Sequence, residues 1–480
     1  MFSVMSGNCE IRQGDCRSLL KELPDESVDL ILTSPPYWSL RDYGSSAEAV
    51  WGGDPACVHE WEEKPKGWPN RGYATRGAEA KRPELKWEKS VPSGGASCRK
   101  CGAWRGQLGL EPDWRMYVEH LREVFRECHR VLKRSGSLAL VLGDTFASSN
   151  GKEGAPCPGT PEKMKLGIPW RVRFALNDDG WISRDDIIWK KSNSMPSSVR
   201  TRFACTYEVV LRFIIDPSPG PYTQVRSSAP PEIEGEFRRR CAAWGSVGVL
   251  PLEMCEPEWR PHLIRLDAYF DLDAVREPHA PSSAARYLQR TLPAQTGGPK
   301  ADASLEATVR KERHSRLIHL SGRERVMREL GINDRLVSGQ GLLFEDCDPV
   351  DPEGERERGK YATTSLRTVI DGLHDNRWPE YVHPYGKNPG DVWTLPTAAF
   401  KGTHFAVFPL VLAERLVAAL CPPGGLVLDP FCGSGTALLA AVRLGRRGLG
   451  FEVNPEYVKM ARRRVVAEVG QGRISFNGDY

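Results

Sequence analysis

The sequence lacks any apolar run that approaches the ~20 residues needed to span a bilayer. The N-terminus also lacks a basic segment followed by an apolar one, so we expect no signal peptide. The chain also has no large excess of either charge: 66 Lys and Arg are nearly balanced by 62 Asp and Glu, which gives a net charge of +4. These absences exclude a membrane span and a generally basic nucleic-acid coat, so any nucleic-acid contact must be a local basic patch.

Length and composition are those of an ordinary globular protein. The 480 residues can form one large core or two or three domains, and 27% are charged and 40% hydrophobic. The 13 cysteines are odd in number and scattered along the chain. That pattern favours a reducing compartment with free thiols, with room for a metal site.

The most informative early stretch is Thr33–Trp38, with the sequence TSPPYW. It follows an apolar run, Val28–Leu32, that predicts a short buried strand, and the prolines end that strand in a stiff turn. Open α/β sheets bind ligands at the carboxyl ends of their strands. Hydroxyl and carbonyl acceptors beside an aromatic ring would suit a planar ligand with an exocyclic amino group, such as a flipped nucleobase. The alternative is a strand-ending loop whose aromatic residues only pack.

A second informative stretch lies near the C-terminus. A strand at 425–429 leads into Pro430-Phe431-Cys432-Gly433-Ser434-Gly435-Thr436, a helix follows, and a second strand ends at Glu452. This order is the first half of a Rossmann-like unit, but the dinucleotide fingerprint G-x-G-x-x-G is missing because position 438 is Leu. A nucleoside cofactor without a pyrophosphate, such as S-adenosylmethionine (SAM), is therefore favoured. The candidate cofactor-binding residues here are Asp429, Phe431, Gly433, Ser434, Gly435, Thr436, Glu452 and Asn454.

Asp15 precedes a predicted helix, Arg17 to Leu23. It either caps that helix or accepts a hydrogen bond from the polar edge of a cofactor.

A polar segment after the TSPPYW stretch carries soft metal ligands. Cys57 and His59 form a tight pair, and Cys98 and Cys101 form a pair with knuckle spacing before Gly102. The segment between them is poor in aliphatic residues, so a structural zinc ion held by three cysteines and one histidine would compensate for a weak core. The alternative is a set of free thiols. We expect no catalytic role for the metal, because four protein ligands leave no open position.

The remaining elements alternate between helix and strand. We expect a helix from Asp113 that ends at Lys133–Gly136, a strand at 137–142, a helix at 168–177, and strands at 182–189 and 206–215. Such alternation predicts a largely parallel sheet. The basic loop between the last two strands, with Lys190, Lys191, Arg200 and Arg202, either contacts phosphates or is a solvated surface.

The middle of the chain breaks this rhythm. Residues 216–385 are rich in Pro, Arg and Glu and predict short helices at 304–320 and 322–330. The arginine runs 238–240 and 310–316 could meet DNA phosphates, or could pair with nearby glutamates on a solvated face.

Taken together, the two informative stretches resemble the DNA amino-methyltransferases of bacterial restriction–modification systems and phages. TSPPYW comes first and DPFCGSGT last, which resembles the beta class, a circular permutation of the common SAM-dependent methyltransferase fold. The resemblance implies an α/β Rossmann-like fold with a zinc-type insertion and an inserted target-recognition region. The expected parts are 1–38 with 113–215 (catalytic), 39–112 (zinc insertion), 216–385 (target recognition) and 386–480 (SAM binding).

The same resemblance implies roles for individual residues. Phe431, Gly433 and Gly435 would wrap the SAM methionine, Glu452 would hold the ribose, and Asp15 would contact the adenine edge. Ser34, Pro35, Pro36 and Tyr37 would form the active-site loop, with Ser34 and the Pro35 carbonyl accepting the amine N–H groups and Tyr37 stacking on the flipped base. Serine at the first position is more typical of enzymes that methylate cytosine at N4 than adenine at N6. Methylation at cytosine carbon-5 is excluded, because neither Cys157 nor Cys421 lies in the context that a nucleophile needs.

We therefore expect a site-specific, SAM-dependent enzyme that methylates the N4 amine of cytosine in double-stranded DNA. Its place would be the cytoplasm of a bacterial or phage-infected cell, in association with the nucleoid, with a cognate restriction endonuclease acting separately. N6-adenine methylation on the same fold, or a non-catalytic zinc-stabilised nucleic-acid-binding protein, are the alternatives. A methyltransferase for RNA or protein is a weaker one.

Overall fold

The computed structural model describes residues 9–40, 43, 45–63, 95–148, 157, 159–194, 199–226, 229–278, 386–397 and 408–470. The chain divides into two compact units. The first combines 1–224, 238–274 and 390–480, and the second combines 225–237 and 275–389. The predicted helices at 304–320 and 322–330 and the arginine run 310–316 lie outside the described residues.

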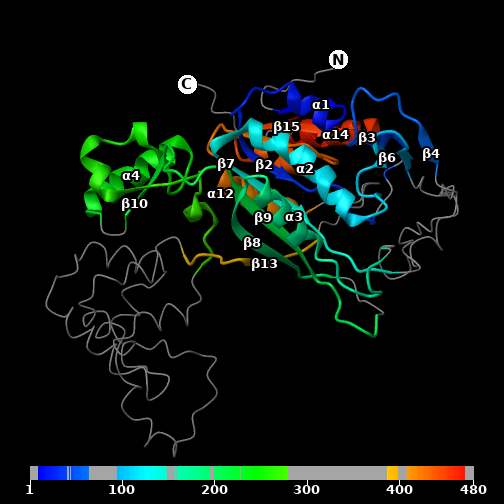
Figure 1. Ribbon diagram of the computed structural model, residues 1–480. Coiled ribbons are helices and arrows are strands. Elements are labelled where there is room, and N and C mark those ends of the chain that lie inside the picture. The colour runs from blue at the N-terminus through cyan, green and yellow to red at the C-terminus, as the bar shows by residue number, and fades with distance from the viewer. Residues whose placement is uncertain are drawn as a thin grey trace, which may run out of the picture. The chain divides into compact units, whose positions relative to one another are not determined.

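An eight-stranded sheet forms the centre of the first unit (Figure 1). In spatial order its strands are β1 (Cys9–Gln13), β15 (Arg447–Glu452), β14 (Leu426–Asp429), β2 (Val28–Thr33), β7 (Leu132–Leu142), β9 (Tyr207–Ile214), β8 (Ile182–Lys191) and β13 (Val392–Leu395). All neighbours in this sheet are parallel except at β9, which is antiparallel to both β7 and β8. The predicted α/β class with a largely parallel sheet is confirmed.

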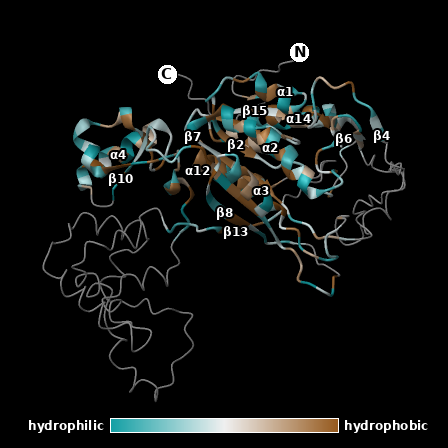
Figure 2. Cartoon of the chain, viewed as in Figure 1, coloured by the Kyte–Doolittle hydropathy of each residue, from teal (hydrophilic) through white to brown (hydrophobic). Residues whose placement is uncertain are grey.

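Helices cover the sheet in two groups. The first comprises α1 (Cys16–Lys21), α2 (Trp114–Val131) and α3 (Ile168–Asp178), and the second comprises α12 (Leu410–Leu420), α13 (Thr436–Arg443) and α14 (Pro455–Gly470). All six residues of β2 are buried, as expected for a strand with both faces covered. Hydrophobic residues gather in the central strands, and hydrophilic ones lie on the outer sides of the helices (Figure 2).

The predicted zinc insertion contains a separate four-stranded antiparallel sheet. Its strands, in spatial order, are β3 (Glu48–Trp51), β6 (Trp104–Gln107), β5 (Ala96–Cys98) and β4 (Trp61–Glu63), and a short 3-10 helix, η1 (Ser45–Ala47), precedes them. Trp51 and Trp104 are buried, and both belong to the same hydrophobic core as α2. The sheet is thereby packed onto the core around the central eight-stranded sheet.

A third sheet follows β9. It contains β11 (Leu250–Pro251), β10 (Tyr222–Val225) and β12 (Leu263–Arg265), accompanied by α4 (Pro231–Trp244) and the 3-10 helices η3 (Leu252–Met254), η4 (Pro257–His262) and η5 (Leu272–Val275). Arg238 pairs with Asp273 at 3.0 Å and Arg240 with Glu256 at 2.5 Å. Two arginines of the run 238–240 are thus engaged in ion pairs. The domain boundaries expected from the sequence stay predictions.

The expected end of the long helix was wrong. The sequence places cations and a C-terminal glycine at Lys133–Gly136, but α2 ends at Val131 and Leu132 already belongs to β7. Leu132 is fully buried and pairs with Val28, and Lys133 forms an ion pair with Asp29 at 2.8 Å. Pairing with β2 therefore overrides the local helix-ending signal.

Within the described part of the chain, no helix combines the length and the apolar composition that crossing a bilayer requires.

Gly136 offers a test of the β2–β7 junction. A Cβ at this position would lie 2.7 Å from Leu132 Cδ1 and 2.9 Å from the Asp29 carbonyl oxygen, so Gly136→Ala must push the two strands apart. We expect it to lower the free energy of unfolding by about 1–3 kcal/mol, measured by denaturant unfolding followed by tryptophan fluorescence. The control is Gly235→Ala in α4, where a Cβ meets nothing within 4 Å. Equal stability of the two variants would show that the junction is loosely packed.

Candidate functional site

A cavity of about 630 Å³ lies at the carboxyl ends of β2 and β14. These strands are parallel neighbours, so the loops that follow them meet at one edge of the sheet. The sequence-predicted residues that line the cavity are Asp15, Ser34, Pro35, Pro36, Tyr37, Asp429, Phe431, Gly433, Ser434, Thr436 and Glu452. Gly435 and Asn454 are not among the lining residues.

One buried hydrogen bond joins the two motifs. The Thr33 hydroxyl donates to Asp429 Oδ1 at 2.6 Å, and the backbone N–H of Phe431 donates to the same oxygen at 3.1 Å. Burial raises the pKa of Asp429 to about 7, and the nearby Glu452 carboxylate adds to that shift. Asp429 thus fixes the start of the glycine-rich turn to the strand that carries Ser34. Thr33 was not predicted as a site residue, although its place directly before the SPPY residues was a usable signal.

Glu452 closes the glycine-rich turn from the next strand. Its carboxylate accepts hydrogen bonds from the backbone N–H groups of Gly433 at 2.9 Å and Asn454 at 2.8 Å, and burial raises its pKa. Gly435 takes a φ of +77°, and a Cβ there would lie 3.0 Å from Ala461 Cβ on α14. The Asn454 side chain caps α14 by accepting from the Glu456 N–H at 2.9 Å. Gly435 therefore shapes the glycine-rich turn, and Asn454 shapes the start of α14, both from outside the cavity.

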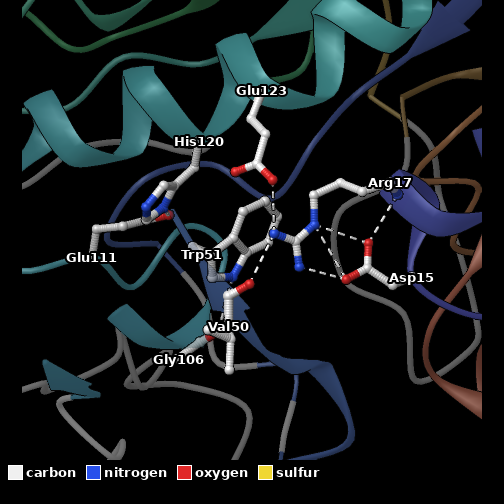
Figure 3. Close-up of polar contacts among 8 residues, drawn as sticks. All are labelled: Asp15, Arg17, Val50, Trp51, Gly106, Glu111, His120 and Glu123. Carbon is white, nitrogen blue, oxygen red and sulfur yellow. Dashed lines mark hydrogen bonds and ion pairs between the residues drawn. The ribbon is translucent and has the colours of Figure 1, made fainter. Parts of the chain in front are cut away.

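Asp15 is both a helix cap and a residue of the cavity wall. It accepts from the Arg17 N–H at 2.9 Å, and its carboxylate pairs with the Arg17 guanidinium at 2.6 Å (Figure 3). The same guanidinium lies 3.9 Å from the Trp51 ring centroid and donates to the Val50 carbonyl at 2.9 Å. Arg17, which was not predicted as a site residue, therefore connects Asp15 to the sheet of the insertion.

The four predicted metal ligands lie together at one end of that sheet. The ligand atoms of Cys57, His59, Cys98 and Cys101 all lie within 4.8 Å of one another. The Cys57 and Cys98 sulfurs are 4.0 Å apart, and Cys101 Sγ is 3.4 Å from His59 Nδ1. Tetrahedral zinc with Zn–S of about 2.3 Å and Zn–N of about 2.0 Å needs ligand separations of roughly 3.5–3.8 Å. The chemistry and spacing of this donor set therefore fit a zinc ion.

The insertion sheet also forms part of the cavity wall, through Ala49, Trp51, Gln107 and Leu108. Its attachment to the core is an aromatic stack in which the His120 ring of α2 lies 5.0 Å from Trp51 and 5.6 Å from Trp104 between centroids. His120 is buried and its Nδ1 lies 2.9 Å from a carboxylate oxygen of the buried Glu111 (Figure 3).

The loop of Pro36 to Ser39 is held by hydrogen bonds from neighbouring segments. Tyr117 donates to the Pro36 carbonyl at 2.8 Å, and the Trp38 indole donates to the Glu111 carbonyl at 3.0 Å. A Cβ at Gly143 would lie 2.8 Å from the Tyr37 ring, so only glycine lets that ring approach β7 so closely. The loop is thus preorganised rather than free.

Two further cavity residues come from β8 and β9. Glu208 accepts from the Tyr37 hydroxyl at 2.7 Å and from Lys191 Nζ at 2.6 Å. Glu208 was not predicted from the sequence, and Lys191 was predicted only as one of the basic residues of a loop that either contacts phosphates or is solvated. Arg202, another of those basic residues, has its guanidinium 3.8 Å from the Phe146 ring centroid.

The known proteins that this chain resembles are described as DNA methylases or type II methyltransferases. The family model N6_N4_Mtase, described as DNA methylase, matches residues 28–463. The type II methyltransferase M.SfiI of Streptomyces fimbriatus is 29% identical over 93% of this chain and 88% of its own. M.SmaI of Serratia marcescens is 23% identical over 96% of this chain and 91% of its own.

Among solved structures, the chain is loosely similar to the PvuII DNA methyltransferase (cytosine-N4-specific), over 96% of this chain and 87% of that one, with 14% identity and a TM-score of 0.42. The family match covers nearly the whole chain, however, and the two motifs that define the cavity lie inside it. The chain therefore belongs to the N6/N4 DNA methylase family and is a DNA methyltransferase that uses S-adenosylmethionine.

Proposed function

We propose that this protein methylates the exocyclic N4 amine of a cytosine that is flipped out of double-stranded DNA. The observation that carries the proposal is that Ser34 lines the same cavity as the glycine-rich turn at Gly433. A serine at this position, where adenine-specific relatives usually have Asp or Asn, favours cytosine.

The cofactor would occupy the side of the cavity formed by the C-terminal motif. Phe431, Gly433, Ser434 and Thr436 surround the position proposed for the SAM methionine. Glu452 would accept from the ribose hydroxyls with the lone pairs that its two backbone hydrogen bonds leave available. Asp15 would accept from the adenine edge, held in place by Arg17. When bound, SAM supplies the methyl group on a sulfonium leaving group.

The target base would lie on the other side, against the SPPY loop. An exocyclic amine is a poor nucleophile because its lone pair is delocalised into the ring. Acceptors at Ser34 Oγ and the Pro35 carbonyl would hold both N–H groups and turn the lone pair toward the methyl group. Much of the acceleration would then come from orientation in a preformed site. The ring of Tyr37 would stack on the base.

The proposed role is in restriction–modification, and the relatives named as type II methyltransferases support it. The enzyme would then act on nucleoid DNA in the cytoplasm. On that reading the enzyme protects one DNA sequence against a cognate endonuclease that acts as a separate protein.

Zinc would have a structural role in this enzyme. Cys57, His59, Cys98 and Cys101 would hold it with four protein ligands and no open coordination position. The insertion is poor in aliphatic residues, so the metal would stabilise a wall of the cavity.

The modified base can be identified directly. DNA methylated by the purified enzyme and digested to nucleosides should contain N4-methylcytosine by mass spectrometry. N6-methyladenine in its place would overturn the assignment of the base while keeping the family. No transferred methyl group at all, with DNA still bound, would favour the non-catalytic alternative.

Ser34→Ala tests the proposed acceptor. Because it removes one hydrogen bond to the reacting amine, we expect kcat for methylation to fall by about 10²-fold or more, while the Kd for SAM changes less than about threefold. The matched control is Ser27→Ala, which removes a hydroxyl that donates to the Pro24 carbonyl far from the cavity motifs. Full activity of Ser34→Ala would defeat the assignment.

Metal content tests the zinc site. Elemental analysis should find one zinc per chain, and Cys98→Ser should lose it and melt at a lower temperature. Cys205→Ser, which removes an exposed thiol outside the set, should keep its zinc. An unchanged zinc content in Cys98→Ser would exclude these ligands.

A further inference from the structure

A continuous chain of hydrogen bonds runs from the SPPY loop to β9 and β8. Ser34 Oγ lies 3.3 Å from the Tyr37 hydroxyl, which lies 2.7 Å from Glu208 Oε2. Lys191 Nζ lies 2.6 Å from the other oxygen of Glu208. Ser34, Tyr37, Lys191 and Glu208 all line the cavity.

The direction of this chain follows from counting hydrogens. An ionised carboxylate can only accept, so the single hydroxyl hydrogen of Tyr37 must point to Glu208. Burial raises the pKa of Tyr37 well above its usual value, and the charge of Glu208 raises it further, so the phenol keeps that hydrogen. The Tyr37 oxygen is then free to accept the one hydrogen of Ser34. The lone pairs of Ser34 are left to face the cavity.

We infer that Glu208 is a positioning residue that makes the Ser34 hydroxyl an acceptor for the target amine. A serine hydroxyl can donate or accept, whereas an amine N–H group needs an acceptor. The carboxylate of Glu208 orients the hydroxyl hydrogen of Tyr37, which in turn makes Ser34 donate to Tyr37. Ser34 can then only accept from the target amine, as a side-chain carbonyl would. This inference rests on the proposed function, because it assumes that an exocyclic amine is the target.

Lys191 keeps Glu208 in this arrangement. Its ammonium group can only donate, and it occupies one carboxylate oxygen, so the other oxygen remains for Tyr37. The side chains of the pair are 23% and 17% exposed, so water competes little with either bond.

The transfer step balances without any proton moving along this chain. The amine nitrogen forms a bond to the methyl carbon, and the C–S bond breaks with its electron pair going to sulfur, which becomes the neutral thioether. The methylated nitrogen then carries one extra proton, which it loses to solvent, so the chain serves only to orient the hydrogen of Ser34.

Glu208→Gln tests this polarity with almost no change in shape. The glutamine has one acceptor oxygen, and Lys191 will donate to it. The NH₂ group of the glutamine therefore faces Tyr37. Tyr37 must then accept, its hydrogen points to Ser34, and Ser34 presents a hydrogen to the target amine. We expect kcat to fall by about 10²-fold, with the Kd for SAM and the KM for DNA within about threefold of wild type.

The double variant Lys191→Met, Glu208→Gln distinguishes a reversed hydrogen-bond direction from a general disturbance of the local structure. Without the competing ammonium group, the glutamine can offer its oxygen to Tyr37, so we expect activity at least about tenfold above that of Glu208→Gln alone. A double variant no better than the single one would overturn the inference. So would a Glu208→Gln enzyme with wild-type kcat.

Tyr37→Phe provides a test that does not depend on how Glu208→Gln folds. It breaks the chain and leaves Ser34 free to rotate, so kcat should fall, but less than in Glu208→Gln. Unchanged kcat in Tyr37→Phe would also overturn the inference. Wild-type enzyme that methylates no amine in the same assay would instead defeat the proposed function, which keeps the two failures distinct.

Discussion

The parallel pairing of β2 with β14 is the contact on which the site depends. It joins Leu30 and Ile31 to Val427 and Leu428, nearly four hundred positions later in the chain. The Thr33–Asp429 hydrogen bond then ties the ends of the two strands together in a buried environment. Because a buried, paired carboxylate is costly to misplace, this bond fixes the distance between the SPPY loop and the glycine-rich turn.

The insertion after the SPPY loop contributes directly to the cavity. Its sheet supplies Trp51 to the cavity wall, and Trp51 contacts both Arg17 and His120 of the core. A segment with few aliphatic residues thus forms part of the cavity wall. The zinc ion proposed for the close set of cysteine and histidine side chains would hold such a segment rigid.

The sheet has one antiparallel member, and that strand changes the chemistry of the cavity. In a fully parallel sheet the first residues of a strand lie at the edge away from the ligand. Because β9 runs the other way, its second residue, Glu208, reaches the same edge as the ends of β7 and β8. A carboxylate is thereby brought to Tyr37, and the ion pair with Lys191 compensates its charge.

The α/β class, the order of the two motifs and the family were all predictable from the residues alone, because each depends on short patterns whose strand–turn context is local. The cavity residues of those motifs were predictable for the same reason, since the ends of parallel strands share one edge. The four candidate metal ligands were also predictable, from the spacing of the cysteines and the histidine and from the scarcity of aliphatic residues between them. The end of α2 needed the folded structure, because the pairing of Leu132 with Val28 outweighs the local signal. The long-range contacts of Thr33, Arg17 and Glu208 also needed it. Their partners lie far away in the chain or on a strand whose direction no local pattern reveals.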